Sequence, residues 1–308
     1  MKTFFYLAQN LYDFLASDRE DVSLEDLARE FDPNVELSED EFLEVFHLPP
    51  INNITEKQKR AKTLKEHQEQ VLEINKAYLA GNITWFEETN EFSDLPDDEF
   101  VATYTGLIGD SEEDIDLESE RFYESYRRHK RSTVPSSYSS VDLGFVSPVK
   151  SQGSCGSCAA FTTLALVETC FKKNLGVPLG DYSEQQLLDC AYGTYGIRGC
   201  DGSPNSYGYA FWLRDNQPKL ASEESYPYTP SRGTCRTDYK GIDLDAEISG
   251  AYYTEEGDEE TMKKLVVDHG AVYTTMHINT YFRQYKAEFS TSMSRLDPRN
   301  CCASSLMP

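Results

Sequence analysis

The pattern of apolar and polar positions predicts helices in the first third of the chain. Short apolar periodicities cover residues 24–31 and 39–46. Residues 56–78 are rich in Lys, Glu and Gln and contain neither Gly nor Pro, which is typical of a surface helix, and Gly81 follows as a stop. The amino-terminal part of the chain is therefore expected to be helical.

A second helical pattern begins at Cys158 and continues to Asn174. Its apolar residues recur at spacings of four, three and four, at Ala160, Leu164, Val167 and Phe171. Ser157 is placed to cap the start of this helix, and Gly176 follows its end.

The rest of the chain predicts one more helix and then strands. Ser183 and Gln186 have the spacing of a capping box, which predicts a helix that runs to Cys190. Beyond Gly241 the pattern changes to that of strands, most clearly over residues 271–278, where β-branched and aromatic residues dominate. Helices and strands are thus expected in separate parts of the chain.

The composition is that of a globular protein with an acidic surface. Of the 308 residues, 39% are hydrophobic and 12% aromatic, which supports a packed core. The formal net charge of −24 repels phosphate backbones and anionic lipid headgroups, so we expect neither nucleic-acid nor membrane partners. No run approaches the ~20 consecutive apolar residues that a membrane span needs.

Charge and cysteine content divide the chain near Arg131. The residues up to Arg131 include 14 basic and 32 acidic side chains, whereas all eight cysteines come later. At the boundary, Arg128, Lys130 and Arg131 have the form of a secretory processing site. So many cysteines favour an oxidising compartment, and we expect the secretory pathway, either lysosomal or extracellular. Residues 1–8 begin like a signal peptide, but polar residues interrupt the apolar run too early.

The candidate chemistry lies in residues 152–161. Cys158 is expected at the start of a helix, where the positive end of the helix dipole favours thiolate, the nucleophilic form. Gln152 can supply a side-chain N–H, which with the backbone N–H of Cys158 would form a two-donor oxyanion hole. Cys158 is therefore a candidate nucleophile and Gln152 a candidate oxyanion-hole residue.

The pair formed by Cys155 and Cys158 has two other interpretations. Taken by itself, the C-x-x-C spacing is equally compatible with a redox pair or with half of a zinc site. However, no second C-x-x-C motif and no His pair at zinc spacing follows in the sequence, and no βαβ pattern precedes the pair. This context favours the nucleophile, and we expect neither a metal nor another cofactor.

Four short motifs follow one another in the second half of the chain, at residues 152–161, 182–190, 199–202 and 224–228. In content and order they resemble the papain family of cysteine peptidases, and its cathepsin L-like members in particular. The upstream half agrees with this resemblance. The spacing of the family's propeptide helix is followed by Glu56, Arg60, Leu64, His67, Val71 and Asn75, with Leu, His and Val where Phe, Asn and Ile are usual. The second propeptide motif is matched by Asn90, Phe92 and Asp94.

The resemblance implies an α+β protein with the papain-like two-lobed fold, a helical lobe and an incomplete β-barrel lobe, preceded by a helical propeptide domain. The expected boundaries are a poorly defined extension over residues 1–40, a propeptide inhibitor-like domain over 41–105, an acidic linker with the processing site over 106–133, and a peptidase domain over 134–308. The resemblance also implies peptide or protein substrates, the chain's own propeptide as an intramolecular inhibitor, and a monomer.

Residue by residue, the resemblance makes Cys158 the nucleophile and Gln152 the oxyanion-hole side chain. It also implies two disulfides, which pair Cys155 with Cys200 and Cys190 with Cys235. Each of these residues stands where the family's motif has its counterpart.

The resemblance further places Gly202 in the substrate cleft, where a peptide backbone could approach closely and bind as an added strand. Ser203 stands in the cleft where a second Gly is usual, and Ala159 stands where Trp is usual. Both departures touch the cleft and therefore the expected subsite preference.

The carboxyl end departs further from the family. The base histidine and its asparagine are expected about 130–150 residues after the nucleophile, but residues 288–308 contain Asn300 and no His. His269 and His277 come too early, since residues 281–285 resemble the segment that precedes the family's histidine. We therefore expect the sequence to be truncated or spliced here, and the chain as written to be inactive. His277 remains the one candidate for a substitute base.

Two classes of function follow. The first is a papain-like cysteine endopeptidase zymogen with an incomplete carboxyl end. The second is a non-catalytic relative whose propeptide or cleft binds a peptidase or a peptide.

Overall fold

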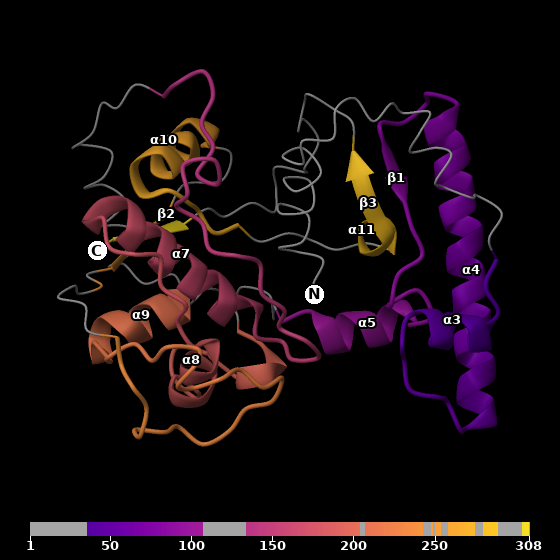
Figure 1. The fold of residues 1–308 in the computed structure, drawn as a ribbon, viewed down its shortest axis with the longest axis horizontal. Coiled ribbons are helices and arrows are strands. Elements are labelled where there is room, and N and C mark those ends of the chain that lie inside the picture. Colours follow the sequence, from indigo (N-terminus) through magenta and orange to yellow (C-terminus); the bar gives the residue numbers. More distant parts are fainter. Residues whose placement is uncertain are drawn as a thin grey trace. The chain divides into compact units, whose positions relative to one another are not determined.

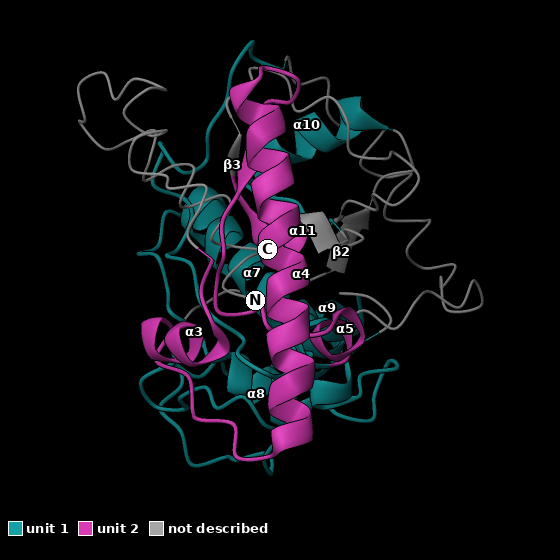
Figure 2. Cartoon of the chain, turned by 90° about the vertical axis from the view of Figure 1, so that its right-hand side faces the viewer, with its two compact units in different colours: residues 1–2, 103–277, 297–308 teal, residues 3–102, 278–296 magenta. Residues whose placement is uncertain are grey.

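The computed structural model describes residues 36–106, 134–203, 207–242, 248, 250–253, 258–274, 280–288 and 304–307 (Figure 1). These residues form two compact units (Figure 2). The helical unit comprises residues 36–102 and 280–288, and the disulfide unit comprises the other described residues. Three expected features lie partly or wholly outside the described residues. They are residues 1–35 of the expected extension, most of the expected linker, and the processing site at Arg128, Lys130 and Arg131.

The first two helices of the helical unit begin at capping side chains. α3 (Glu39–Val45) starts with a capping box, because Ser38 Oγ accepts from the Glu41 N–H and the Glu41 carboxylate accepts from the Ser38 N–H at 2.9 Å. α4 (Ile54–Leu79) is capped by the side-chain oxygen of Asn53, which accepts two backbone N–H groups. Both helices therefore begin where a side chain satisfies their first donors.

A strand pair in the helical unit joins distant parts of the chain. β1 (Trp85–Glu87) pairs antiparallel with β3 (Tyr285–Glu288), which directly follows the short α11 (Thr280–Gln284). Asn75 of α4 holds β1 from the side: its Nδ2 donates to the Glu87 carbonyl and its Oδ1 accepts from the Glu87 N–H, both at 2.9 Å. Residues 280–288 therefore belong to the same unit as the long helix, although the disulfide unit precedes them in sequence.

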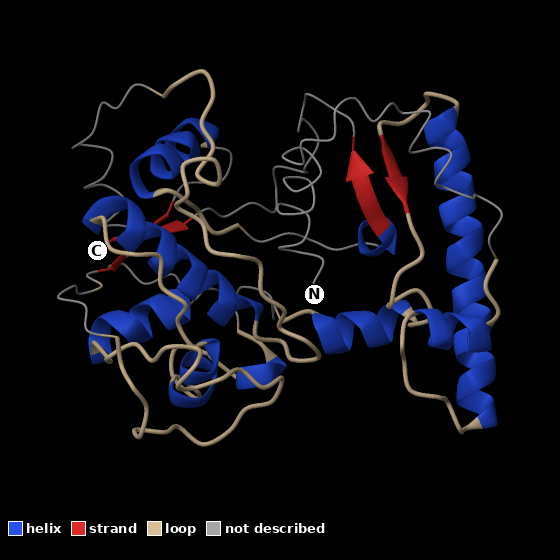
Figure 3. Cartoon of the chain, viewed as in Figure 1, coloured by secondary structure: helices blue, strands red, loops and turns tan. Residues whose placement is uncertain are grey.

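The disulfide unit is mostly helical in its described part (Figure 3). Its helices are α7 (Cys158–Leu175), α8 (Glu184–Cys190), the 3-10 turn η2 (Gly199–Asp201), α9 (Tyr207–Asn216) and α10 (Glu259–His269). Its strands β2 (Gly250–Tyr253) and β4 (Ser304–Met307) pair antiparallel. α5 (Asp97–Tyr104) contains the sequence boundary between the two units.

The core of the disulfide unit forms around α7. Leu164 and Val167 of α7 are buried with Leu187 of α8 and with Tyr209 and Leu213 of α9, in one apolar cluster. α7 ends at Gly176, which adopts a left-handed conformation with a φ of 68°. The apolar spacing along residues 158–174 is thus the face that α7 turns toward this core.

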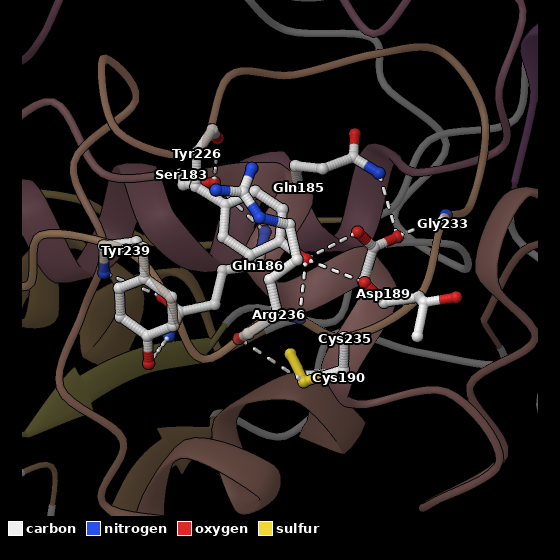
Figure 4. Close-up of a disulfide and its surroundings, with 12 residues drawn as sticks. Ser183, Gln185, Gln186, Asp189, Cys190, Tyr226, Gly233, Cys235, Arg236 and Tyr239 are labelled. Carbon is white, nitrogen blue, oxygen red and sulfur yellow. Dashed lines mark hydrogen bonds between the residues drawn. A yellow bond between two sulfur atoms is a disulfide. The ribbon is translucent and has the colours of Figure 1, made fainter.

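Two disulfides fasten the loops of this unit, Cys155 to Cys200 and Cys190 to Cys235, each with a sequence separation of 45 residues. Figure 4 shows the second of these disulfides and its surroundings. Next to it, the Asp189 carboxylate accepts hydrogen bonds from Tyr226 Oη at 2.7 Å and from Gln185 Nε2 at 2.9 Å. The disulfide and this buried carboxylate together hold the loop around residues 226–236 against α8.

The long helices agree with those expected from the sequence, whereas the region after Gly241 differs from the expected strands. The helix expected over residues 56–78 is confirmed as α4, and that over 158–174 as α7. Of the strand expected over 271–278, residues 275–278 lie outside the described residues, and the described part has only a β-bridge at Tyr273. The region after Gly241 contains strands β2, β3 and β4, but also helix α10, which the pattern did not predict.

The expected caps also differ from those observed. The capping box at Ser183 is only half formed: its Oγ accepts from the Gln186 N–H, whereas the Gln186 side chain donates to the Lys219 carbonyl. Ser157 stands at the N-cap of α7 but makes no capping bond there, because its hydroxyl bonds Tyr228 instead. Tertiary partners have replaced the local ones.

Candidate active site

Cys158 is the first residue of α7, and its thiol takes part in no disulfide. The start of α7 presents backbone N–H groups that have no acceptor within the helix. The loop before it turns sharply at Gly153, whose φ is 57°, a conformation that favours glycine. The sequence therefore places a thiol at a helix amino terminus, directly after a tightly turned loop.

Gln152 lies at the start of this loop and is only 4% exposed. Its Nε2 donates to the Cys155 carbonyl at 2.7 Å, which fixes the amide and leaves it one further N–H. The loop is held from the other side by the Cys155–Cys200 disulfide and by the Gly156 N–H, which donates to the Cys200 carbonyl at 2.9 Å. The pairing is the one that the resemblance implies.

Residues 105 and 106 lie over the thiol, within the disulfide unit. The Gly106 carbonyl accepts from the Ser203 N–H at 2.8 Å, and the Gly106 N–H acts to lower the pKa of the Cys158 thiol. Gly106 also touches the backbone of Gly156 so closely that a Cβ on Gly106 would lie 2.2 Å from the Gly156 carbonyl oxygen. Glycine is therefore required at position 106 for this approach.

The covered site changes the expectation for the thiol. The start of α7 was expected to favour thiolate, but burial raises the pKa of Cys158 in this structure. The N–H groups of Ala159, Gly106 and Cys158 act in the opposite direction without outweighing burial. With residue 106 in place, the protonated thiol is favoured.

Ser203 and Gly202 were both expected to bind substrate backbone. The Ser203 N–H holds residue 106, whereas the Gly202 N–H donates to the Gly199 carbonyl at 3.1 Å within its own turn. Gly202 has a φ of 100° and a ψ of −170°, a conformation almost restricted to glycine. Ala159, in the position where Trp is usual, is buried in the α7 core cluster.

Tyr228 is a site residue to which the sequence motif gave no role. Its hydroxyl donates to the Gln152 carbonyl at 2.8 Å and lies 2.7 Å from Ser157 Oγ. Its ring meets Phe161 edge-on at 4.8 Å between centroids, and burial raises the pKa of Tyr228 to about 12. One neutral phenol thus connects both ends of the loop that carries Gln152 and Cys158.

No described histidine of the disulfide unit lies near the thiol. His269 stands at the end of α10, where its Nδ1 is 3.4 Å from the Asn174 amide nitrogen. Asn174 is sixteen residues after Cys158 in the same helix, or about 24 Å along the axis at ~1.5 Å per residue. His269 is therefore excluded as a base, while His277 and Asn300 lie outside the described residues.

The propeptide-motif residues converge in the helical unit. Arg60 bonds Glu56 at 2.7 Å and lies 3.6 Å from the Asp94 carboxylate, and burial raises the pKa of Asp94. Asn90 Nδ2 donates to the Arg283 carbonyl at 2.9 Å. The remaining two residues are Phe92, which meets Phe100 edge-on, and Asn75, which holds β1.

Comparison with known proteins agrees with this arrangement. Residues 134–299 match the family described as "Papain family cysteine protease". The chain belongs to the papain family of cysteine proteases. It is 31% identical over 239 residues to a cathepsin L-like proteinase of Fasciola hepatica, covering 76% of this chain and 68% of the relative. Ananain of Ananas comosus is 35% identical over 197 residues, which are 64% of this chain and 53% of ananain.

Solved structures of papain-family precursors share the fold. Digestive procathepsin L2 proteinase from Tenebrio molitor larval midgut matches with a TM-score of 0.69 at 26% identity, over 86% of this chain and 82% of that one. The recombinant stem bromelain precursor matches with a TM-score of 0.62, also at 26% identity, over 86% of this chain and 79% of that one. The α+β, papain-like fold expected from the sequence is confirmed.

Two further properties concern the described residues alone. None of their helices is both long enough and apolar enough to cross a membrane. Nor do they bring together three or more His, Cys, Asp or Glu side chains in a group that could hold a metal ion.

Proposed function

We propose that this chain is the precursor form of a papain-type cysteine endopeptidase, with residues 105 and 106 placed over its nucleophile as an intramolecular inhibitor. The observation that carries the proposal is the place of Gly106, whose carbonyl accepts from the Ser203 N–H and whose backbone packs against that of Gly156, two residues before Cys158. A substrate backbone bound as an added strand would use the same Ser203 donor. Residue 106 therefore competes with substrate for the cleft.

The proposed chemistry begins when this segment leaves. The Cys158 thiolate attacks a peptide carbonyl carbon, and the oxyanion accepts hydrogen bonds from the Cys158 N–H and from the second N–H of Gln152. Collapse of the intermediate breaks the C–N bond and leaves a thioester, provided that the departing amine receives a proton. Water then hydrolyses the thioester and regenerates the thiolate.

The proton for the amine is the step for which the described residues offer no group. A papain-type site takes that proton from an imidazolium, and His269 is at the far end of α7. We propose that the 308 residues as written bind substrate and form the oxyanion hole but turn over peptides orders of magnitude more slowly than family members do. The same observation favours the second candidate, a non-catalytic relative that binds peptides in the cleft.

The processing site supplies the route to an uncovered cleft. Cleavage after Arg131 would separate residue 106 from the rest of the disulfide unit, so that the segment is held by non-covalent bonds alone. A secreted chain should yield a new amino terminus near Ser132. A terminus elsewhere would require a different division into propeptide and peptidase.

Chemical rescue tests the catalytic proposal. The cleaved chain is assayed with a dipeptidyl fluorogenic substrate, with and without added imidazole, beside a Cys158→Ser variant. We expect near-background turnover that rises with imidazole concentration and is absent in Cys158→Ser, because free imidazole can protonate the leaving amine.

Two other results would change the assignment. Robust turnover without imidazole that a His277→Ala substitution abolishes would mean that the chain carries its own base. If imidazole has no effect while the cleaved chain still binds a peptide, the non-catalytic, peptide-binding function is the better description.

A further inference from the structure

Arg283 is among the largest fully buried side chains of the described residues, at 1% exposure, and it lies in α11 just before strand β3. A guanidinium keeps its charge in proteins, so burying it is costly unless several partners receive its N–H groups. The helical unit supplies those partners from residues 67–100. This makes Arg283 a specific contact rather than part of an apolar core.

The partners of the guanidinium surround it on different sides. Nη1 donates to the Leu95 carbonyl at 3.0 Å, and Nη2 lies 2.9 Å from the Asp97 carboxylate. The ring of Phe100 lies 5.2 Å from the guanidinium carbon, within cation–π range. The backbone carbonyl of Arg283 is also held, by Asn90 Nδ2.

His67 provides the remaining acceptor, and its tautomer follows from its neighbours. Its Nδ1 lies 2.7 Å from the Ser93 carbonyl, which can only accept, so Nδ1 carries the hydrogen. Its Nε2 then presents a lone pair to Arg283 Nη2, at 2.5 Å. His67 is the residue that stands where Asn is usual in the propeptide helix, so this departure from the pattern has a partner in Arg283.

Gln284, the next residue, is also fully buried, and its Nε2 donates to Ser93 Oγ at 3.2 Å. The strand that follows is held by groups that would accept many sequences. β3 pairs with β1 through backbone bonds, and Lys286 reaches the exposed Glu88 at 2.6 Å, with both side chains about half exposed. Backbone pairing gives affinity, whereas buried side-chain pockets give selectivity. Selectivity in this interface therefore lies at the buried positions 283 and 284, of which only Arg283 carries a charge.

We propose that the helical unit is an arginine-selective docking surface for a strand of the peptidase. The arginine that it selects lies two residues before the first residue of that strand, as Arg283 lies before Tyr285. The occupant in this chain is its own residues 280–288. The acceptors of His67, Leu95 and Asp97 match the planar fork of arginine, which lysine cannot reproduce. As an inhibitory domain, and in that respect resting on the proposed function, the unit would bind papain-family chains that carry this arginine and reject those with lysine or leucine there.

Hydrogen exchange on the full chain tests this surface without measuring proteolysis. Amide exchange of fragments covering residues 280–288 is compared for wild type, Arg283→Lys, Arg283→Leu and Lys286→Leu. We expect at least ~10-fold faster exchange for both Arg283 variants, because each leaves buried acceptors unpaired. Lys286→Leu, which removes a cation from the exposed side of the same strand, should change exchange by less than ~3-fold.

A competition arm uses the wild-type chain, so that folding of a variant does not matter. The synthetic nonapeptide of residues 280–288 is added, and exchange of the chain's own strand is followed. The peptide should release that strand at concentrations at least ~10-fold lower than peptides with Arg283→Lys or Arg283→Leu. Equal competition by the three peptides, or wild-type exchange in the Arg283→Lys chain, would overturn the proposal and leave the catalytic one untouched.

Discussion

The two compact units differ in cysteine content and in the size of their apolar clusters. The disulfide unit packs an apolar cluster around Leu164 and Leu187 and closes its loops with two disulfides. The helical unit contains no cysteine, has a small apolar cluster around Phe42 and Leu64, and buries the polar side chains of Glu87 and Arg283. Only the disulfide unit should therefore respond to reduction, whereas buried carboxylates should make both units sensitive to pH, through Glu184 in the disulfide unit and Glu87 in the helical unit.

The two tryptophans of the chain make this comparison measurable. Trp212 is buried in α9 of the disulfide unit, and Trp85 is in β1 of the helical unit. A Trp85→Phe background therefore reports the disulfide unit, and a Trp212→Phe background reports the helical unit. Urea unfolding in each background gives a separate free energy for each unit.

The largest expected effect is the loss of the Cys190–Cys235 disulfide. Replacing both cysteines by alanine should destabilise the disulfide unit by about 4 kcal/mol, since the bond closes a loop of 45 residues. The helical unit should change little. Cys170→Ala, which removes a buried thiol outside the disulfides, is the control and should cost about 1 kcal/mol. Equal destabilisation of both units by the double variant would contradict their separate treatment.

Truncating a core leucine should destabilise the disulfide unit more than the helical unit, because its apolar cluster is larger. Leu164→Ala in α7 should cost the disulfide unit about 3–4 kcal/mol, because the surrounding helices cannot close the cavity. Leu64→Ala in α4 should cost the helical unit about 2–3 kcal/mol, because its smaller cluster can relax into the gap. Urea midpoints in the two tryptophan backgrounds measure both. A larger loss for Leu64→Ala would reverse the ranking.

Glu87 should make the helical unit sensitive to pH. It is fully buried, and burial raises its pKa to about 7. Its folded pKa exceeds its unfolded value, so its stabilising contribution is complete below about pH 4.5 and is lost as pH rises through 7. In wild type the free energy of unfolding of the helical unit should fall by up to about 1.4 kcal/mol per pH unit between pH 5 and 7, and Glu87→Gln should remove this decline.

The control and the opposing group for this prediction lie on the same helix. Glu69→Gln alters an exposed carboxylate of α4 and should leave the pH dependence as in wild type. Burial lowers the pKa of His67, so its contribution has the opposite sign and is lost as pH falls. If Glu87→Gln and Glu69→Gln give the same profile from pH 5 to 7, Glu87 is not the group that titrates.

The smallest expected effect is that of Tyr228→Phe. The substitution removes two neutral hydrogen bonds, to Gln152 and Ser157, but keeps the ring on Phe161, so about 1 kcal/mol of stability should be lost. Tyr192→Phe, at a half-exposed ring, serves as the matched control. A loss above about 3 kcal/mol would mean that the loop depends on Tyr228 for its fold.

Local patterns predicted the long helices and the position of Cys158 at a helix start, because those depend on apolar spacing and on residues close in sequence. They did not predict Gly106 over Cys158, Tyr228 across the loop or Arg283 beside His67. Each of these contacts joins residues far apart in the chain, and each depends on backbone approach or on a neighbour's tautomer.

Residue 106 covers the Cys158 thiol, and alkylation of that thiol measures the cover directly. Iodoacetamide labelling of Cys158 is followed by peptide mass spectrometry in the intact chain and in Gly106→Ala, with Cys170 as the internal reference because burial raises its pKa to about 11. Gly106→Ala cannot approach Gly156, so Cys158 should react at least ~10-fold faster there while Cys170 stays slow. Equal rates at Cys158 in the two chains would mean that residue 106 does not cover the thiol.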